Sequence, residues 1–155
     1  MRVGTDNIGA AAVQPQQIMF DSGTSLLYYP PSYKNALLFP ITGFHESVYE
    51  DGYWYVDCNA KNLPSLFLYV QGYWLEIPSE AYIFYIFKDR SEKLCLIGMV
   101  ENDDEYWLAG DVFLISYYQV YDDDNSQMIL SPRKKSSVAT IEFGPEPWRY
   151  FSDFD

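Results

Sequence analysis

The chain has 155 residues, 48% of them hydrophobic and 19% aromatic, which is enough for one domain with a proper core and excludes a disordered chain. Its formal net charge of −12 at pH 7 argues against nucleic acids and anionic membrane surfaces as partners, because both are polyanions. The most apolar runs, residues 81–87 and 94–100, are shorter than the ~20 residues that a membrane-spanning helix needs.

An acidic turn follows a short apolar segment near the start of the chain. Residues 18–30 read Ile-Met-Phe-Asp-Ser-Gly-Thr-Ser-Leu-Leu-Tyr-Tyr-Pro. Because Gly23 has no side chain, its N–H can approach the Asp21 carboxylate, and the hydroxyls of Ser22, Thr24 and Ser25 can hold it. A surface turn would use the same residue types. The apolar run that follows, however, places this carboxylate beside a core.

Short segments separated by turn residues predict an all-β domain. Strands are expected at residues 53–58, 112–121 and 128–130, and a hairpin at residues 66–70 and 73–77 around Gln71-Gly72. Short helices are expected at residues 32–38, after Pro31, and at residues 79–84, after Pro78, because proline is well tolerated in the first turn of a helix. A third helix could begin at Asp111.

Two features bear on the cellular compartment. The first seven residues contain no apolar signal-peptide region, so the chain is either cytosolic or begins upstream of Met1. Cys58 and Cys95 are 37 positions apart in strand-like settings, and they could form a disulfide in an oxidising compartment or remain two buried thiols. Neither alternative is favoured by the cysteine count.

The sequence predicts no metal site and no cofactor. Residues 122–125 read Asp-Asp-Asp-Asn, but the sixth position of a calcium loop would be Gln127 and the twelfth Arg133, so a solvated hairpin tip is expected. His45 is the only histidine, which disfavours zinc sites and His-dependent nucleophiles, and we assign it no role.

Several short motifs follow one another in an informative order. Asp-Ser-Gly-Thr at residues 21–24 precedes Val-Asp-Cys at 56–58, Leu-Pro at 63–64 and Cys-Leu-Ile-Gly at 95–98. Trp-Leu-Ala-Gly-Asp-Val-Phe-Leu then occupies residues 107–114. From about residue 9 to residue 132, this order resembles the pepsin-like aspartic peptidases, and in particular their C-terminal lobe.

The resemblance implies that residues 1–132 form the all-β C-terminal lobe of a bilobal acid protease with a few short helices. Asp21 would then be one of two catalytic aspartates, with the other in an N-terminal lobe. In the family the two carboxylates share a proton; one accepts a proton from water while the other protonates the scissile carbonyl oxygen. The implied partner is a peptide or protein substrate.

The family pattern also implies roles for the neighbours of Asp21. Gly23 and Thr24 would donate hydrogen bonds to its carboxylate, and both bonds favour the ionised form. Ser22, where the family often has threonine, would direct its hydroxyl to the other lobe. Gly110 would cross behind the turn, where only a hydrogen at Cα allows the approach.

Further implications concern the cleft and the compartment. Met19 and Leu108 would contact substrate on the primed side, although apolar residues at strand ends are more often core. Thr24 would also contact substrate. A Cys58–Cys95 bridge is implied, as is a location in the secretory pathway, either extracellular or lysosomal/vacuolar.

Three hypotheses follow from the single Asp-Ser-Gly turn. The chain is a fragment of a full peptidase that needs its N-terminal lobe, or a homodimeric, retropepsin-like peptidase in which two copies of Asp21 meet. Alternatively, it is an inactive lobe that binds a peptide or partner. Residues 133–155 form an acidic and aromatic C-terminal extension, expected to be solvated, with docking on the lobe or on a partner as the alternative.

Overall fold

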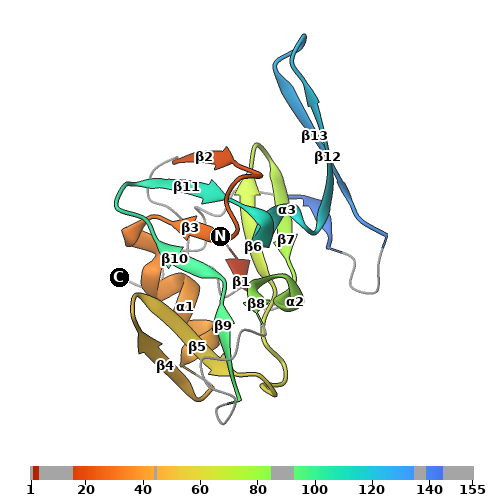
Figure 1. The fold of residues 1–155 in the computed structure, drawn as a ribbon. Coiled ribbons are helices and arrows are strands. Elements are labelled where there is room, and N and C mark those ends of the chain that lie inside the picture. The colour runs from red at the N-terminus through yellow and green to blue at the C-terminus, as the bar shows by residue number, and fades with distance from the viewer. Residues whose placement is uncertain (1, 4–15, 44, 85–92, 135–138, 145–155) are drawn as a thin grey trace.

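The computed structural model describes residues 2–3, 16–43, 45–84, 93–134 and 139–144 (Figure 1). Within these residues the fold consists of three four-stranded sheets, one two-stranded sheet and a few short helices. The all-β class expected from the sequence is confirmed. None of the helices in the described part of the chain is long and apolar enough to cross a membrane.

One four-stranded sheet holds the segments around the Asp21 turn. Its strand order is β10-β3-β11-β2, in which β11 runs parallel to β2 and antiparallel to β3. The central position of β11 brings a distant segment directly beside the strand that ends at Asp21. The strands are β2 (Gln17–Phe20), β3 (Leu27–Tyr29), β10 (Met99–Glu101) and β11 (Tyr106–Ala109).

A second sheet is built around the hairpin predicted at Gln71-Gly72. Both turn residues have positive φ, +47° and +91°, and glycine adopts such a conformation without a steric penalty. The strand order is β1-β6-β7-β14, so a segment near the end of the described chain forms one edge of this sheet. The strands are β1 (Arg2–Val3), β6 (Leu66–Val70), β7 (Tyr73–Ile77) and β14 (Ile141–Phe143).

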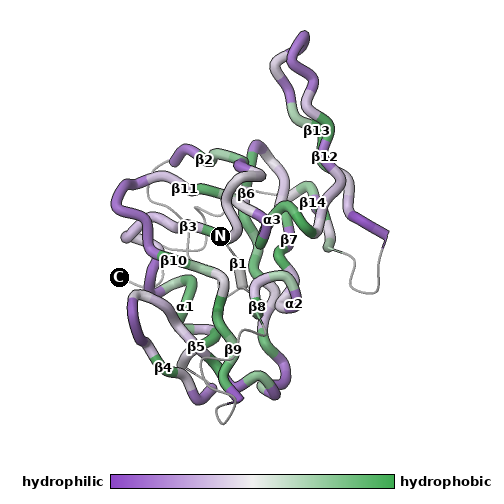
Figure 2. Tube along the Cα trace, in the orientation of Figure 1, coloured by the Kyte–Doolittle hydropathy of each residue, from purple (hydrophilic) through white to green (hydrophobic). Residues whose placement is uncertain are grey.

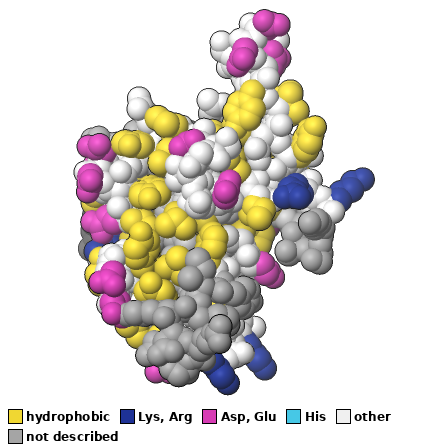
Figure 3. All heavy atoms as spheres, in the orientation of Figure 1, with side chains coloured by type: hydrophobic (Ala, Val, Ile, Leu, Met, Phe, Trp, Pro, Cys, Tyr) yellow, Lys and Arg dark blue, Asp and Glu magenta, His cyan; other side chains and the backbone are white. Residues whose placement is uncertain are grey.

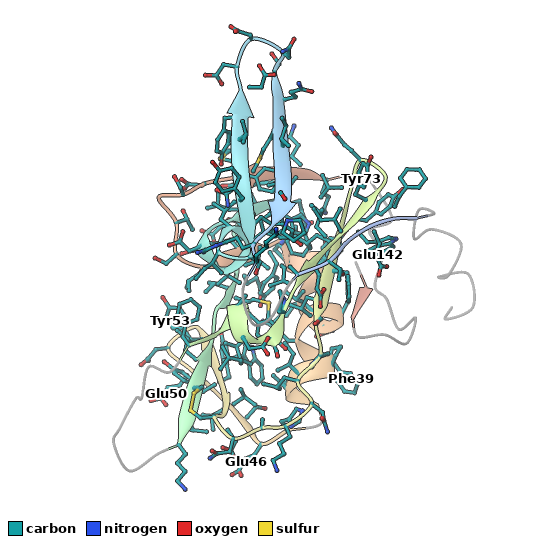
Figure 4. All side chains as sticks on the ribbon, turned by 90° about the vertical axis from the view of Figure 1, so that its right-hand side faces the viewer. Phe39, Glu46, Glu50, Tyr53, Tyr73 and Glu142 are labelled. Atoms are coloured by element: carbon teal, nitrogen blue, oxygen red, sulfur yellow. A yellow bond between two sulfur atoms is a disulfide. The ribbon has the colours of Figure 1, made fainter. Side chains whose placement is uncertain are left out.

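The third sheet contains the disulfide at its end. Its order is β4-β5-β9-β8, and every neighbouring pair is antiparallel. Cys58 and Cys95 are bonded, with their Cα atoms 4.9 Å apart, and the sulfur–sulfur bond is visible in Figure 4. The strands are β4 (Ser47–Glu50), β5 (Tyr53–Asp57), β8 (Ile83–Phe84) and β9 (Leu94–Ile97).

A long hairpin projects from the body of the molecule (Figure 1). It consists of β12 (Tyr117–Asp122) and β13 (Gln127–Pro132), which pair along their whole length and with no other strand in the described chain. Figure 2 shows a hydrophilic tip and a more hydrophobic lower part. The tip contains the acidic residues 122–124, as expected for a solvated turn.

In the described part of the chain, four short helices connect the sheets. Pro31 lies in the first turn of η1, where its missing N–H is tolerated. The helices are η1 (Pro31–Tyr33), α1 (Lys34–Thr42), α2 (Ser79–Tyr82) and α3 (Asp111–Leu114). Their buried side chains join those of the sheets in one core cluster, which includes Leu27, Leu37, Ile77, Phe113 and Tyr117.

The structure corrects several predicted boundaries. The strand expected at residues 112–121 begins only at Tyr117, because residues 111–114 form α3, the third helix expected to begin at Asp111. The first N–H groups of α3 are bound by carbonyls of the Asp21 turn. β5 ends before Cys58, because the Asp57 carboxylate accepts the Asn59 N–H and turns the chain. The helix expected at residues 79–84 ends at Tyr82, because the next two residues pair with β9.

The C-terminal extension also differs from the solvated segment that was expected. Residues 139–144 lie against the lobe, with Ala139 buried in the core and β14 paired with β7. Figure 4 shows Glu142 and Tyr73 near each other where these two strands meet. Residues 135–138 and 145–155 lie outside the described residues.

Gly110 lies where two backbone segments cross. A Cβ atom at this position would lie 2.1 Å from the Thr24 carbonyl oxygen and 2.5 Å from the Leu26 carbonyl oxygen. Both neighbours are backbone atoms, so neither can rotate away. The closeness of the crossing therefore requires glycine.

Removing the disulfide should destabilise the lobe. On the chain-entropy estimate, a Cys58→Ala/Cys95→Ala variant loses about 4 kcal/mol in free energy of unfolding, measured by denaturant titration, because the unfolded chain is no longer cross-linked. Wild-type protein treated with a thiol reductant provides the control and should lose a similar amount. A loss below about 1 kcal/mol in both samples would contradict this expectation.

Gly110→Ala should lower the free energy of unfolding more than the same substitution at a glycine whose nearest neighbours are side-chain atoms. We expect a loss of about 2–4 kcal/mol in unfolding free energy, because the backbone must move to relieve the clash. The matched control is Gly144→Ala, where the nearest atoms belong to the Trp74 side chain at 3.1 and 3.3 Å. Its expected loss is below about 1 kcal/mol, and equal losses at the two sites would refute the crossing argument.

Candidate active site

The Asp21 turn directly follows β2 and is tied to the neighbouring strand. The Asp21 N–H donates to the Ala109 carbonyl oxygen at 3.0 Å, at the end of β11. Within the turn, the Thr24 N–H donates to the Asp21 carbonyl oxygen at 3.2 Å. The chain thus reverses at Asp21 while its backbone remains attached to the sheet.

Each oxygen of the Asp21 carboxylate accepts one hydrogen bond from the turn. The Gly23 N–H donates to Oδ1 at 2.9 Å, and the Thr24 hydroxyl donates to Oδ2 at 2.6 Å. Both donors belong to residues expected from the sequence to hold this carboxylate. With two fixed donors, the plane of the carboxylate is defined by the turn itself.

These hydrogen bonds lower the pKa of Asp21 below its ordinary value, with the Thr24 hydroxyl as the larger cause and the Gly23 N–H as the smaller one. Both donors favour the anion, whereas the slight burial of the group opposes it. A depressed folded-state pKa stabilises the fold above the unfolded-state pKa, and this stabilisation is lost as the pH falls through the folded pKa.

Helix α3 holds the back of the turn through three backbone hydrogen bonds. The N–H groups of Gly110, Asp111 and Val112 donate to the carbonyl oxygens of Leu26, Thr24 and Ser25, at 3.2, 2.8 and 3.2 Å respectively. The hydrogen bonds explain why the crossing at Gly110 is so close.

The other predicted site residues lie around the turn. Met19 and Leu108 are register partners in β2 and β11, and Met19 is 57% exposed. Ser22 is exposed at the tip of the turn. The structure therefore brings Met19, Leu108 and Ser22 together with Asp21 on adjoining segments.

An aromatic stack beneath the turn was not anticipated from the sequence. The ring of Phe20 lies 5.4 Å from that of Phe113 in α3, and Phe113 is stacked on Tyr117 at 4.9 Å. Phe113 and Tyr117 are four residues apart, a spacing that brings side chains together across a helical turn. The four-residue spacing was the feature of the sequence from which this ring contact could have been predicted. The strand expected at residues 112–121 would instead have kept the two rings apart.

The described residues offer the oriented carboxylate of Asp21 and no metal site. No group of three or more His, Cys, Asp or Glu side chains in this part of the chain could hold a metal ion. Asp51-Gly52, which lacks the intervening hydroxyl residue, forms the turn between β4 and β5. Asp21 alone can accept a proton from a water, but it cannot share a proton without a second carboxylate.

Comparisons with known proteins show which proteins this chain resembles. The chain is 38% identical over 119 residues to gastricsin from Homo sapiens, and 37% identical over 119 residues to gastricsin from Macaca fuscata fuscata. Both alignments cover 72% of this chain and 29% of the relative. Gastricsin from Mus musculus is 33% identical over 137 residues, which cover 84% of this chain and 33% of that protein.

The chain thus spans about a third or less of the length of these curated relatives. A family model described as eukaryotic aspartyl protease matches residues 1–133, most of the 155-residue chain. This match includes the Asp21 turn, the disulfide and the Gly110 crossing. The chain belongs to the eukaryotic aspartyl protease family.

Proposed function

We propose that this chain supplies one catalytic carboxylate, Asp21, to an aspartic endopeptidase. The observation that supports this role most strongly is the pair of hydrogen bonds from Gly23 and Thr24, one to each oxygen of the carboxylate. The turn that holds Asp21 also lies within the residues that match the eukaryotic aspartyl protease family. Family membership makes peptide-bond hydrolysis the reaction to test.

The proposed chemistry is the addition of water to a peptide carbonyl. The ionised carboxylate accepts a proton from the water, which attacks the carbonyl carbon, while a second carboxylate protonates the carbonyl oxygen. Two adjacent carboxylates do not both ionise readily, so they hold one proton between them. Because the turn favours the anion, Asp21 suits the base in this pair.

The neighbours of Asp21 have supporting roles in this proposal. Ser22 is exposed at the turn tip, and we propose that it hydrogen-bonds the lobe that provides the second carboxylate. Met19 and Leu108, paired across β2 and β11, are proposed to contact apolar substrate side chains on the primed side, together with Thr24. Gly110 has a purely steric role, because any side chain there would displace the turn.

The second carboxylate is proposed to come from an N-terminal lobe of the same protein. This is supported by the relatives, of whose length the chain covers 29–33%. A second copy of this chain, with two Asp21 turns meeting on a twofold axis, is the alternative arrangement. An inactive lobe that only binds a peptide or partner is the remaining candidate.

The projecting hairpin provides a surface for the proposed lobe. Tyr118, Val120 and Ile129 are 68%, 41% and 51% exposed. Val120 and Ile129 are register partners, and Tyr118 lies on the same face as Val120, so the three form one apolar face. Hydrophobic side chains are visible along this hairpin in Figure 3. An isolated two-stranded sheet is marginal in water, and contact with a further lobe would stabilise it.

The disulfide supports a location in an oxidising compartment of the secretory pathway. Extracellular and lysosomal or vacuolar locations both agree with the proposal.

Replacement of Asp21 tests the catalytic role. The transcript upstream of Met1 decides which protein is assayed. If it encodes, in frame, a lobe with an Asp-Thr-Gly or Asp-Ser-Gly turn, the two-lobed protein is assayed. If it does not, this chain is assayed over a range of concentrations. Asp21→Asn should reduce cleavage of denatured globin at acid pH by roughly 10²–10⁴-fold, because the base is lost. A statine-type inhibitor should block the wild-type activity.

Asp51→Asn is the matched control, because Asp51 also precedes a glycine in a turn but lies in the β4–β5 hairpin, and it should retain full activity. Cleavage that survives Asp21→Asn would refute the proposal. Absence of cleavage in either form of the protein would favour the inactive binding lobe instead. Activity that rises with the square of chain concentration would identify the two-copy arrangement.

The hydroxyl of Thr24 should control the ionisation of Asp21. Thr24→Val keeps the shape of the side chain but removes the larger of the two hydrogen bonds, so the pKa of Asp21 should rise toward its ordinary value. A ¹³C NMR titration of the carboxyl carbon measures this change. Ser25→Ala removes a neighbouring hydroxyl and should leave the titration unchanged, whereas equal behaviour of the two variants would contradict the assignment.

A further inference from the structure

Helix α3 lies between the Asp21 turn and the C-terminal segment, defined here as residues 133–134 and 139–144. On one side, the N–H groups at the start of α3 bind the carbonyls of Thr24 and Ser25. On the other, the Arg133 N–H donates to the Ser116 carbonyl at 3.0 Å, and its guanidinium donates to the Ile115 carbonyl at 3.0 Å. The carbonyls that follow α3 are therefore satisfied by the C-terminal segment.

Tyr117 connects the end of α3 to strand β14. Its side chain is 2% exposed, and its hydroxyl donates to the Glu76 carbonyl at 2.6 Å, with the Thr140 carbonyl oxygen also nearby at 3.4 Å. Burial raises the pKa of Tyr117, so the hydroxyl stays protonated and remains a donor. This hydroxyl meets the backbone where the C-terminal segment joins the sheet.

The junction itself is held by Glu76 and Thr140. One carboxylate oxygen of Glu76 accepts both the Thr140 N–H and the Thr140 hydroxyl, each at 2.8 Å. The Glu76 N–H in turn donates to the Thr140 carbonyl at 3.1 Å. With Ala139 buried beside it, this exchange of hydrogen bonds fixes the segment at one register on β7.

The aromatic stack extends this contact to the catalytic turn. Tyr117 stacks on Phe113, which is fully buried, and Phe113 contacts Phe20, the residue before Asp21. The two centroid separations, 4.9 and 5.4 Å, are those of rings in direct contact. A continuous line of packed side chains thus runs from the Thr140 junction to the base of the Asp21 turn.

We propose that the C-terminal segment positions the Asp21 turn through α3, with Tyr117 as the positioning residue that links the two. Residues 139–144 lie beyond the part of the chain that matches the family model, which ends at residue 133. The support from Thr140 and β14 is therefore an addition to the matched residues, whereas Arg133 lies within them. The importance of this support for catalysis rests on the proposed role of Asp21. The effect of the support on the geometry of the turn does not depend on that role.

The physical basis is the geometry of the two hydrogen bonds on Asp21. Both donors, the Gly23 N–H and the Thr24 hydroxyl, belong to a turn whose carbonyls are held by α3. If α3 is held less firmly at its far end, the turn gains freedom and these bonds lengthen on average. The carboxylate anion is then less well stabilised, which is measurable without any substrate.

The test compares two buried tyrosines. Tyr117→Phe keeps the aromatic stack but removes the hydroxyl at the junction. Tyr82→Phe removes an equally buried hydroxyl that donates to the Pro64 carbonyl at 2.6 Å, and it serves as the matched control. A third variant ends at Lys134 and lacks β14. Each is titrated by ¹³C NMR of the Asp21 carboxyl, after the dispersion of the amide spectrum has shown that it is folded.

We expect Tyr117→Phe to raise the pKa of Asp21 by about half a unit, roughly threefold in proton affinity, and the truncation to raise it at least as much. Tyr82→Phe should leave the pKa of Asp21 at the wild-type value. The melting temperature of the Tyr82→Phe variant should nevertheless fall by about as much as that of Tyr117→Phe. If Tyr117→Phe and Tyr82→Phe give the same Asp21 pKa, the positioning role is refuted. If the truncated chain does not fold, the comparison of Tyr117→Phe with Tyr82→Phe still tests the positioning role. A failure of peptide cleavage would refute only the proposed function.

Discussion

The candidate site depends on one steric constraint, the crossing of two backbone segments at Gly110. A side chain there would lie 2.1 Å from the Thr24 carbonyl oxygen, and no rotation of a neighbour could relieve the clash. Because the crossing is close, α3 can bind the carbonyls of the turn, and the N–H and hydroxyl donors of the turn are free to face Asp21. Loss of this approach would remove the orientation of the carboxylate and leave an ordinary surface aspartate.

The domain that orients the Asp21 carboxylate also exposes the surfaces that the proposed second lobe would contact. Ser22 is exposed at the turn tip, and Tyr118, Val120 and Ile129 form an uncovered apolar face on the projecting hairpin. Behind the turn the opposite holds, because Phe113 and Tyr117 are buried and the C-terminal segment is paired with β7. The lobe is thus closed at the back of the turn, while its hairpin and turn tip remain open.

Local features of the sequence predicted those parts of the structure that depend on local chemistry. The Asp21 turn was recognisable because small and hydroxylated residues surround an acid, and the β6–β7 turn because glycine permits its positive φ. The disulfide could not be predicted from cysteine spacing alone; the resemblance to a family implied it. The structure shows the bond between Cys58 and Cys95.

Elements that depend on distant pairing could not be predicted. For residues 112–114 the sequence allowed both a strand and a helix beginning at Asp111; the helix forms because carbonyls nearly ninety positions earlier bind its first N–H groups. β8 and β14 are two and three residues long, and each exists only through its partner strand. The docking of residues 139–144 depends on the Glu76–Thr140 hydrogen bonds, whose partners are 64 positions apart.

Titration of Asp21 in the assembled enzyme tests the proposed dyad most directly. In the isolated chain, its carboxyl should titrate in a single step below the ordinary pKa, because only the turn acts on it. In an assembly that cleaves peptides, whether two-lobed or two-copy, a shared proton predicts two coupled steps at the same carbon, the second at higher pH. A single unchanged step in a catalytically active assembly would contradict a shared proton and the role proposed for Asp21.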